Sequence, residues 1–122
     1  KLLLDRRRRI LISADFRRVY RRGRRINGKI LKIYFNNNRS KTTRFGYSIS
    51  KKVGKAVQRN LLKRRLREIC RNNISTFKPG LDIIIVARKN AANSSYSDLE
   101  KEVLKLGRVG KILTGRESSG IK

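Results

Sequence analysis

The residues whose types and spacing best suit a chemical task are the lysines and arginines between positions 51 and 71. Nine cations stand there against one acid, Glu68. Apolar residues at helical spacing, Leu62, Leu66 and Ile69, predict a helix over about residues 56–73. Successive residues of a helix are rotated by about 100° around its axis. On this spacing a second stripe of the predicted helix is polar and cationic. Its members are Asn60, Lys63, Arg64, Arg67 and Arg71, with Arg59 at the border. Cations about one turn apart can follow a phosphate backbone, so this helix predicts a polyanion-binding surface.

The composition of the whole chain favours the same kind of partner and argues against several enzyme classes. Its 122 residues include 34 lysines and arginines, 8 acids and no histidine, for a net charge of +26. So dense a positive charge opposes compaction by self-repulsion and favours a polyanionic partner. Apart from Glu100 and Glu102, the acids are scattered singly. A hydrolase built on a histidine triad, a zinc-binding histidine pair or paired acids is therefore not expected.

The single cysteine and the lack of long apolar runs bear on the compartment. Cys70 has no partner for an intramolecular disulfide, and its place on the apolar stripe predicts an inert core thiol. One cysteine fits a reducing compartment. No apolar run approaches the roughly 20 residues that a membrane-spanning helix needs, and Leu2 to Leu4 is too short for the core of a signal peptide. We therefore expect a cytoplasmic protein with no membrane partner.

Two further helices are predicted from their end signals. Ser13 is a suitable N-cap for a helix to about residue 22, and Gly23 follows as its stop. Ser97 and Glu100 have the spacing of a capping box, which predicts a last helix from there to about residue 106.

Three strands are predicted from runs of β-branched and aromatic residues. They span residues 28–35, 44–50 and 81–87, and the last is apolar enough to be covered on both faces. The polar segment 36–43 has a length that suits a wide hairpin between the first two. One face of that hairpin is unusual for a core, because it combines Tyr34 with small and polar residues, namely Gly46, Ser48 and Ser50.

The order of these elements, α-β-β-α-β-α, predicts the α+β class and a single-domain α/β sandwich. We expect one domain over residues 1–107, opening with a basic arm over residues 1–12. Residues 108–122, rich in glycine, serine and lysine, are expected to form a flexible basic C-terminal tail.

Several spaced motifs in the chain resemble one known family. Lys51-Lys52, Gly54, Ala56-Val57, Arg59-Asn60, Lys63-Arg64 and Arg67-Glu68 look like the signature of the bacterial ribonuclease P protein subunit. The likeness continues in Asp15 to Tyr20 with Gly23, in Arg44 to Ser50, in Asp82 to Arg88 and from Tyr96 onward. It covers roughly residues 5–106. The chain departs from the pattern at Leu61, where the family usually has another basic residue after Arg-Asn.

The resemblance implies a fold and an activity beyond those that composition indicates. The family's small sandwich contains a left-handed βαβ crossover, contrary to the usual right-handed rule. Its members bind a catalytic RNA that removes the 5′ leader of precursor tRNA by Mg²⁺-dependent hydrolysis of a phosphodiester. The implied partners are that RNA and precursor tRNA, with no obligate protein partner. Mg²⁺ would be bound mainly by the RNA, with no organic cofactor and no catalytic residue in the protein.

The resemblance also implies roles for single residues. The face that docks on the catalytic RNA would comprise Lys51, Lys52, Arg59, Asn60, Lys63, Arg64, Arg67 and Arg71. A central cleft for the single-stranded leader would comprise Phe16, Tyr20, Tyr34 and Ser48. That cleft has a physical rationale of its own, because bases stack on aromatic rings while cations follow the backbone.

Two other functions remain open at this stage. A small basic ribosomal or other structural RNA-binding protein would co-sediment with ribosomes and would not stimulate precursor cleavage. A protein that coats DNA without sequence preference would bind duplex as well as RNA, with a steep salt dependence. The aromatic residues favour single-stranded RNA over both.

Overall fold

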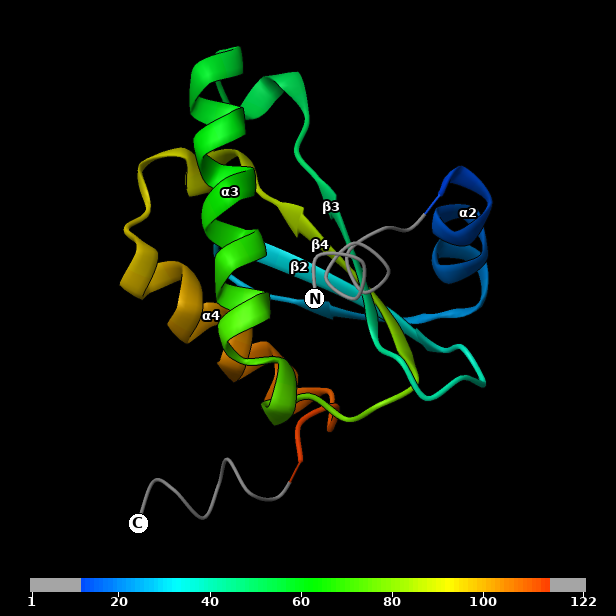
Figure 1. The fold of residues 1–122 in the computed structure, drawn as a ribbon. Coiled ribbons are helices and arrows are strands. Elements are labelled where there is room, and N and C mark those ends of the chain that lie inside the picture. The colour runs from blue at the N-terminus through cyan, green and yellow to red at the C-terminus, as the bar shows by residue number, and fades with distance from the viewer. Residues whose placement is uncertain (1–11, 115–122) are drawn as a thin grey trace, which may run out of the picture.

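A four-stranded sheet in the order β1-β2-β4-β3 organises the computed structural model, which describes residues 12–114 (Figure 1). Its strands are β1 (Arg24–Asn27), β2 (Leu31–Asn37), β3 (Arg44–Ser48) and β4 (Leu81–Ala87). Its α-helices are α2 (Ser13–Arg22), α3 (Ala56–Asn72) and α4 (Tyr96–Val109). Short 3-10 segments are η1 (Lys51–Val53), η2 (Ile74–Thr76) and η3 (Lys89–Asn93). No helix within the described range is long and apolar enough to cross a membrane.

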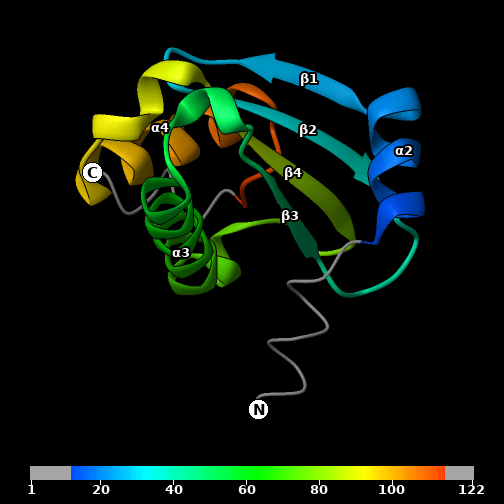
Figure 2. The ribbon, with the colours of Figure 1, turned by 90° about the horizontal axis from the view of Figure 1, so that it is seen from above.

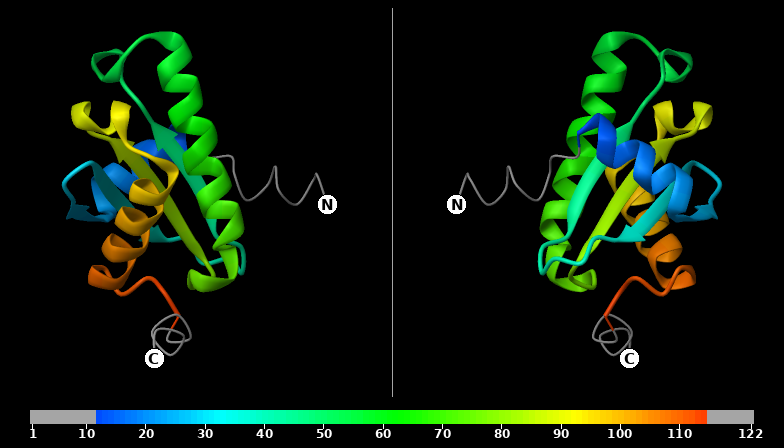
Figure 3. Two further views of the ribbon diagram at one scale, coloured as in Figure 1. Left: turned by 90° about the vertical axis from the view of Figure 1, so that its left-hand side faces the viewer. Right: turned by 90° about the vertical axis from the view of Figure 1, so that its right-hand side faces the viewer.

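The helices lie on opposite faces of the sheet. Viewed from above, α3 and α4 lie on one side of the strands and α2 on the other (Figure 2). The two side views show α3 and α4 in front of the sheet in one panel and α2 lying across the strands in the other (Figure 3). We call the face under α3 and α4 the closed face and the face that carries α2 the open face.

The closed face supplies most of the hydrophobic core. Leu31, Ile33, Ile83 and Ile85 are fully buried there. They belong to one cluster with the apolar stripe of α3, which is Leu62, Leu66, Ile69 and Cys70, and with Leu99, Val103 and Leu106 of α4. Both stripes have the i, i+3, i+4 spacing of helices that bury one side, so the amphipathic patterns predicted from the sequence are confirmed.

The pairing of β3 differs from the sequence prediction. The strands over residues 31–37 and 44–48 do not form a hairpin, because β4 lies between them, antiparallel to β2 and parallel to β3. A strand at the centre of a sheet is shielded from water more fully than a strand at its edge. The apolar β4 is therefore favoured in the central position between β2 and β3. The parallel β3 and β4, joined through α3, form a βαβ unit. The α+β class and the element order are confirmed, with one strand added.

The added strand is β1, which pairs antiparallel with β2. Its sequence, Arg-Arg-Ile-Asn, has one apolar residue and therefore gives no alternating pattern. As a result the expected strand start at residue 28 was wrong. Residues 28–30 are the turn between β1 and β2, where the Glu102 carboxylate of α4 accepts the Ile30 backbone N–H at 3.0 Å.

Two helix starts also differ from prediction. Ile12, not Ser13, is the N-cap of α2, and the Asp15 carboxylate accepts the Ile12 N–H at 3.1 Å. Ser95, not Ser97, caps α4, with its hydroxyl accepting the Asp98 N–H at 3.0 Å. Gly23 does end α2, in an extended conformation, where a Cβ would lie 2.5 Å from the backbone oxygens of Val19 and Phe35.

The C-terminal tail does not begin at residue 108. Helix α4 continues to Val109, and Ile112 and Leu113 are buried, with Leu113 bridged to Phe77. These apolar side chains join the core, which is why the chain stays packed through Thr114. Residues 115–122 of the expected tail, and residues 1–11 of the expected basic arm, lie outside the described range.

Candidate nucleic-acid interface

The cations predicted to dock on RNA lie along one exposed side of η1 and α3. Lys51 and Lys52 are exposed in η1, just before the helix. Along α3, Arg59 and Arg67 are half-buried, and the other members of the predicted face are exposed, namely Asn60, Lys63, Arg64 and Arg71. The structure therefore brings all eight predicted residues onto one helix and the 3-10 turn before it. We call this set the α3 surface.

Two arginines of the α3 surface have unmet hydrogen-bonding capacity. The Nε atoms of Arg59 and Arg67 are buried and have no acceptor among residues 12–114. By contrast, Arg65 points to the other side and donates to the Ser94 carbonyl at 3.0 Å, which makes it a structural residue. A guanidinium short of acceptors suits a phosphate oxygen, because its N–H groups match phosphate geometry.

Two exposed apolar residues border the cationic surface of α3. Val57 is 80% exposed and Leu61 is 40% exposed. Leu61 thus occupies an accessible position, where the family pattern has a cation.

The open face of the sheet consists of three rows of side chains. Strand register places the members of each row side by side on β2, β4 and β3. The rows are Asn36, Asp82 and Arg44, then Tyr34, Ile84 and Gly46, then Lys32, Val86 and Ser48. The middle row lies under α2, where Val19 and Ile84 form a small buried cluster. Most of this face is therefore polar, small or aromatic, in agreement with the unusual pattern seen in the sequence.

An aromatic cluster flanks α2 on this face. The Tyr20 and Tyr34 rings meet edge to face with centroids 4.7 Å apart, and Phe16 lies 6.2 Å from Tyr20. Tyr20 is 42% exposed, so part of its ring is available for stacking. Ser48 is one row away from Tyr34, paired with Val86, which itself packs against the cluster. The four residues predicted for the leader thus lie on one face of the sheet.

A network of ion pairs ties the start of α2 to the strands. Arg44 donates two hydrogen bonds to the buried Asp82 carboxylate, at 2.9 and 2.8 Å. Arg44 also lies 3.5 Å from Asp15, which in turn accepts from Arg18 at 3.0 Å. Asn38 donates to Asp82 at 2.9 Å. This network fixes the position of α2 and therefore that of its aromatic residues.

The ion pairs also shift two pKa values. Burial alone would raise the pKa of Asp15, but the Ile12 N–H, Arg18 and Arg44 outweigh it and hold that pKa below its ordinary value. Hydrogen bonds to Asp82 raise the pKa of the Arg44 guanidinium. Both shifts favour the charged pair.

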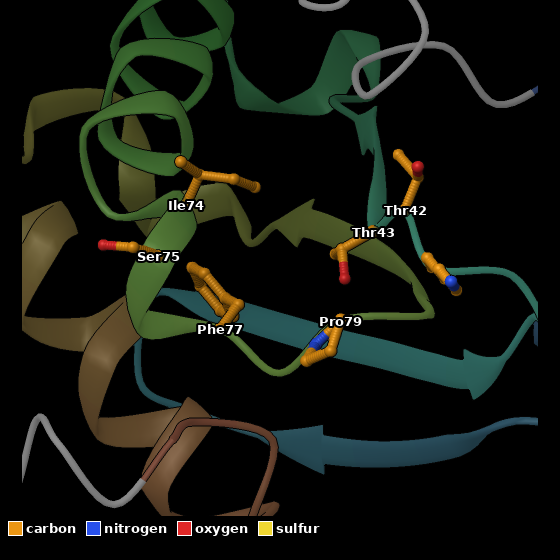
Figure 4. A pocket seen from close by; sticks show the side chains of 7 residues that line it. Thr42, Thr43, Ile74, Ser75, Phe77 and Pro79 are labelled. Carbon is orange, nitrogen blue, oxygen red and sulfur yellow. The ribbon is translucent and has the colours of Figure 1, made fainter.

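Two hollows open beside the loop that joins β2 to β3. The larger, about 590 Å³, is lined by Arg18, Arg22, Asn36, Asn37, Asn38, Arg39, Arg44 and Asp82. The smaller, about 320 Å³, is lined by Lys41, Thr42, Thr43, Ile74, Ser75, Phe77 and Pro79 (Figure 4). In the smaller hollow, the Thr43 hydroxyl donates a hydrogen bond to the Lys78 carbonyl at 2.7 Å. Lys41 is the only cation among the residues that line this hollow.

The acidic side chains and the cysteine of the described range do not gather into a metal-binding group. Among residues 12–114, no three His, Cys, Asp or Glu side chains lie close enough to hold a metal ion. Burial raises the pKa of the Cys70 thiol to about 12, with a smaller opposing effect from a hydrogen bond to Tyr47. Cys70 is therefore protonated at neutral pH, and the prediction of an inert core thiol is confirmed.

Sequence reasoning missed two groups near this interface. Arg25 of β1 is the register partner of Tyr34 and adds a cation beside the aromatic cluster. Since β1 carries no periodic signal, nothing in the sequence indicated this position. The pairing of Arg44 with Asp82 was also missed, because it depends on β3 lying next to β4.

A small, strongly basic α+β fold with a cationic helix and a partly exposed aromatic cluster has the features of a protein that binds a polyanion such as RNA. The ribonuclease P family model matches residues 4–109. The chain therefore belongs to the ribonuclease P protein family, whose members are the protein part of the ribonucleoprotein endoribonuclease ribonuclease P.

Individual relatives agree with this assignment. The ribonuclease P protein component of Clostridioides difficile is 41% identical over 95 residues, which is 77% of this chain and 83% of the relative. The solved structure of the Staphylococcus aureus RNase P protein has a TM-score of 0.81 at 31% identity, covering 88% of this chain and 98% of that one. The Thermotoga maritima RNase P protein has a TM-score of 0.76 at 28% identity, with 82% and 96% covered.

Proposed function

We propose that the α3 surface binds the RNA subunit of ribonuclease P. Its cations lie along one side of α3 and of the 3-10 turn before it, and Glu68 is the only acid that α3 carries. Regular spacing on a rigid helix lets several phosphates be contacted at once without ordering a loop. Arg59 and Arg67 are half-buried, and their terminal guanidinium N–H groups would donate to phosphate oxygens on binding.

We further propose that the aromatic cluster holds the single-stranded 5′ leader of precursor tRNA. The observation that carries this proposal is the edge-to-face pair of the exposed Tyr20 and the half-buried Tyr34, set beside a sheet face that no helix but α2 covers within residues 12–114. Phe16 extends the ring surface, and Ser48 offers a hydroxyl one row away. Every base has a π-face, so such a surface can hold a leader of any sequence.

In this proposal the protein supplies fixed positive charge and the RNA supplies the hydrolytic chemistry. Cations of the α3 surface would neutralise phosphates that otherwise repel one another, and so lower the Mg²⁺ concentration that the RNA requires. Mg²⁺ itself is assigned to the RNA, because the carboxylates of Asp15 and Asp82 both form ion pairs with arginines. No organic cofactor and no further protein partner are needed for these roles. We place the protein in the cytoplasm, with precursor tRNA as substrate.

The test is precursor tRNA cleavage by a bacterial ribonuclease P RNA at low Mg²⁺, with and without the protein. We expect protein-dependent cleavage at the mature 5′ end and no cleavage by protein alone. A precursor with a leader too short to reach the aromatic cluster is the matched control. It should keep the gain that comes from charge neutralisation and lose the gain that comes from leader binding.

The two parts of the proposal fail in different ways. No stimulation of either precursor at any Mg²⁺ concentration would contradict binding to the RNA subunit. Equal stimulation of long-leader and short-leader precursors would contradict the leader assignment and leave the α3 surface intact.

A further inference from the structure

The larger hollow lies on the flank of α2 opposite the aromatic cluster. Phe16 and Tyr20, four residues apart, lie on one side of α2, and Arg18 and Arg22 lie on another side, about 200° away around the helix axis. Val19, between them, is buried against Ile84 of the middle row. Helix α2 therefore divides the open face into an aromatic flank and an arginine flank.

Four arginines converge on the arginine flank, and only part of their charge is balanced. Arg44 and Arg18 are paired with the carboxylates of Asp82 and Asp15. The side chains of Arg22 and Arg39, which complete the lining, make no ion pair and no hydrogen bond with residues 12–114. Two positive charges are thus left facing one hollow of about 590 Å³. Like charges gathered in a concavity attract an anion more strongly than the same charges on a convex surface.

The loop between β2 and β3 holds one of these arginines in an unusual conformation. Arg39 has a φ of 62°, in the left-handed region that non-glycine residues seldom adopt. Its N–H donates to Asn37 Oδ1 at 3.2 Å, and the next N–H, that of Ser40, donates to Asn38 Oδ1 at 2.8 Å. Asn38 is itself anchored to Asp82 and to the Gly80 carbonyl. A short hydrogen-bonded loop therefore fixes the Arg39 backbone at the edge of the hollow.

The remaining lining adds neutral polar groups. The Asn36 side chain has no hydrogen-bond partner within residues 12–114, and Asn37 still has its amide N–H groups available. Amides beside a pair of guanidinium groups suit a phosphate whose attached nucleotide also offers base and sugar oxygens and nitrogens.

We propose that this hollow, which we call the arginine pocket, binds a backbone phosphate of single-stranded RNA. The inference does not depend on the leader assignment, because none of its residues belongs to the α3 surface or the aromatic cluster. Arg22 and Arg39 supply the charge, Arg44 and Asp82 form the fixed wall, and Asn36 and Asn37 meet the adjoining nucleotide. An RNA strand held here is positioned across α2 from any base stacked on Phe16 and Tyr20.

The test compares two double variants that remove equal charge. Arg22→Gln with Arg39→Asn removes both unpaired cations of the arginine pocket, and asparagine tolerates the left-handed conformation at position 39. The matched control is Arg17→Gln with Arg21→Gln, which alters two exposed arginines of the same helix outside the pocket. Arg44 is left intact because it anchors α2.

The probe is an oligouridylate of about six nucleotides, titrated into the full-length protein at several salt concentrations, with the side-chain amide signals of Asn36 and Asn37 followed by NMR. We expect these signals to move with the oligonucleotide. In the pocket variant the movement should be lost and the affinity should fall by about tenfold or more. The slope of log affinity against log salt should fall by about 0.7, the value for one phosphate of a single strand. The control variant should lose less than about threefold in affinity, and its Asn36 and Asn37 signals should still move on addition of the oligonucleotide.

Three outcomes would overturn the proposal. Asparagine signals that do not respond to the oligonucleotide would show that the pocket is not a site. Equal losses in the pocket and control variants would show general attraction rather than a defined site. Inorganic phosphate that moves the same signals at the same concentration as the oligonucleotide would assign the pocket to a free anion instead of RNA. Thermal unfolding of both variants, expected to match the unchanged protein, checks that a loss of binding is not a loss of fold.

Discussion

The two faces of the sheet are built by different physical means. The closed face buries rows of aliphatic side chains, such as Ile33 and Ile85, against two helices and makes one continuous core. The open face has only the short α2, held by one small apolar cluster and by the ion pairs among Asp15, Arg44 and Asp82. Stability is therefore concentrated on one face, while rings, arginines and amides remain accessible on the other. A sheet of this size can support a binding face because its other face supplies the core.

The largest expected effect is a loss of stability from truncation on the closed face. Leu66→Ala removes a side chain with no exposed surface, so the free energy of unfolding should fall by about 2–5 kcal/mol, measured by denaturant titration. Val57→Ala on the same helix, 80% exposed, should change it by less than about 0.5 kcal/mol. Similar losses in both variants would show that α3 is not packed as described.

On the open face, the largest expected effect is on binding rather than on stability. Phe16→Ala should weaken binding of leader-bearing precursor tRNA by about 1–3 kcal/mol, the value of one stacked base, and leave mature tRNA unchanged. Phe16→Leu keeps an apolar side chain packed against Val19 and Ile84 but removes the ring on which a base would stack. It should therefore lose nearly as much affinity for the leader-bearing precursor as Phe16→Ala does. If Phe16→Leu binds the leader like the unchanged protein, or if both RNAs lose equally, Phe16 acts in packing and not in stacking.

The α3 surface should respond to salt in a way that the aromatic cluster does not. In the proposed role Arg67 contacts one phosphate, so with Arg67→Ala the slope of log affinity for ribonuclease P RNA against log salt should fall by about 1, with the leader preference unchanged. Arg59→Ala should act in the same direction. Lys105→Ala, on the exposed side of α4, is the control and should leave the slope unaltered. An equal change in the control would show that binding depends on net charge alone.

The difference between the two faces also explains which features the sequence could predict. Leu62, Leu66 and Ile69 mark α3 because burial on one side leaves a 3.6-residue period, and Leu81 to Ala87 marks β4 because burial on both sides leaves an unbroken apolar run. Local patterns of this kind survive without knowledge of the fold. The predicted members of the α3 surface came from the same kind of signal, strengthened by a family resemblance.

The features that escaped prediction depend on contacts between distant residues. Arg44 and Asp82 are 38 residues apart and meet only because β4 lies beside β3. Likewise Arg25 lies beside Tyr34 only because β1, with a single apolar residue, pairs with the edge of β2. A hairpin between residues 31–37 and 44–48 was a reasonable local choice that the burial of β4 overrode. The arginine pocket is made of such non-local contacts and so left no sequence signature.

The smallest expected effect concerns the acid sensitivity of α2. The pKa of Asp15 is lower in the folded protein than in the unfolded chain, where it is about 3.9. The stabilisation from its contacts is therefore fully present above about pH 5, and it is lost as the pH falls through the lowered pKa of the folded state. Because the Arg18 side chain is 48% exposed and its ion pair is therefore screened by water, the contribution is about 1 kcal/mol. We expect amide hydrogen exchange to show that α2 loses protection on acidification before α3 and β4 do.

Asp15→Asn should show this early opening already at neutral pH and no further change on acidification. Simultaneous loss of protection in α2 and α3 would contradict the separation of the two faces, because the ion pairs would then be part of the same cooperative unit as the core.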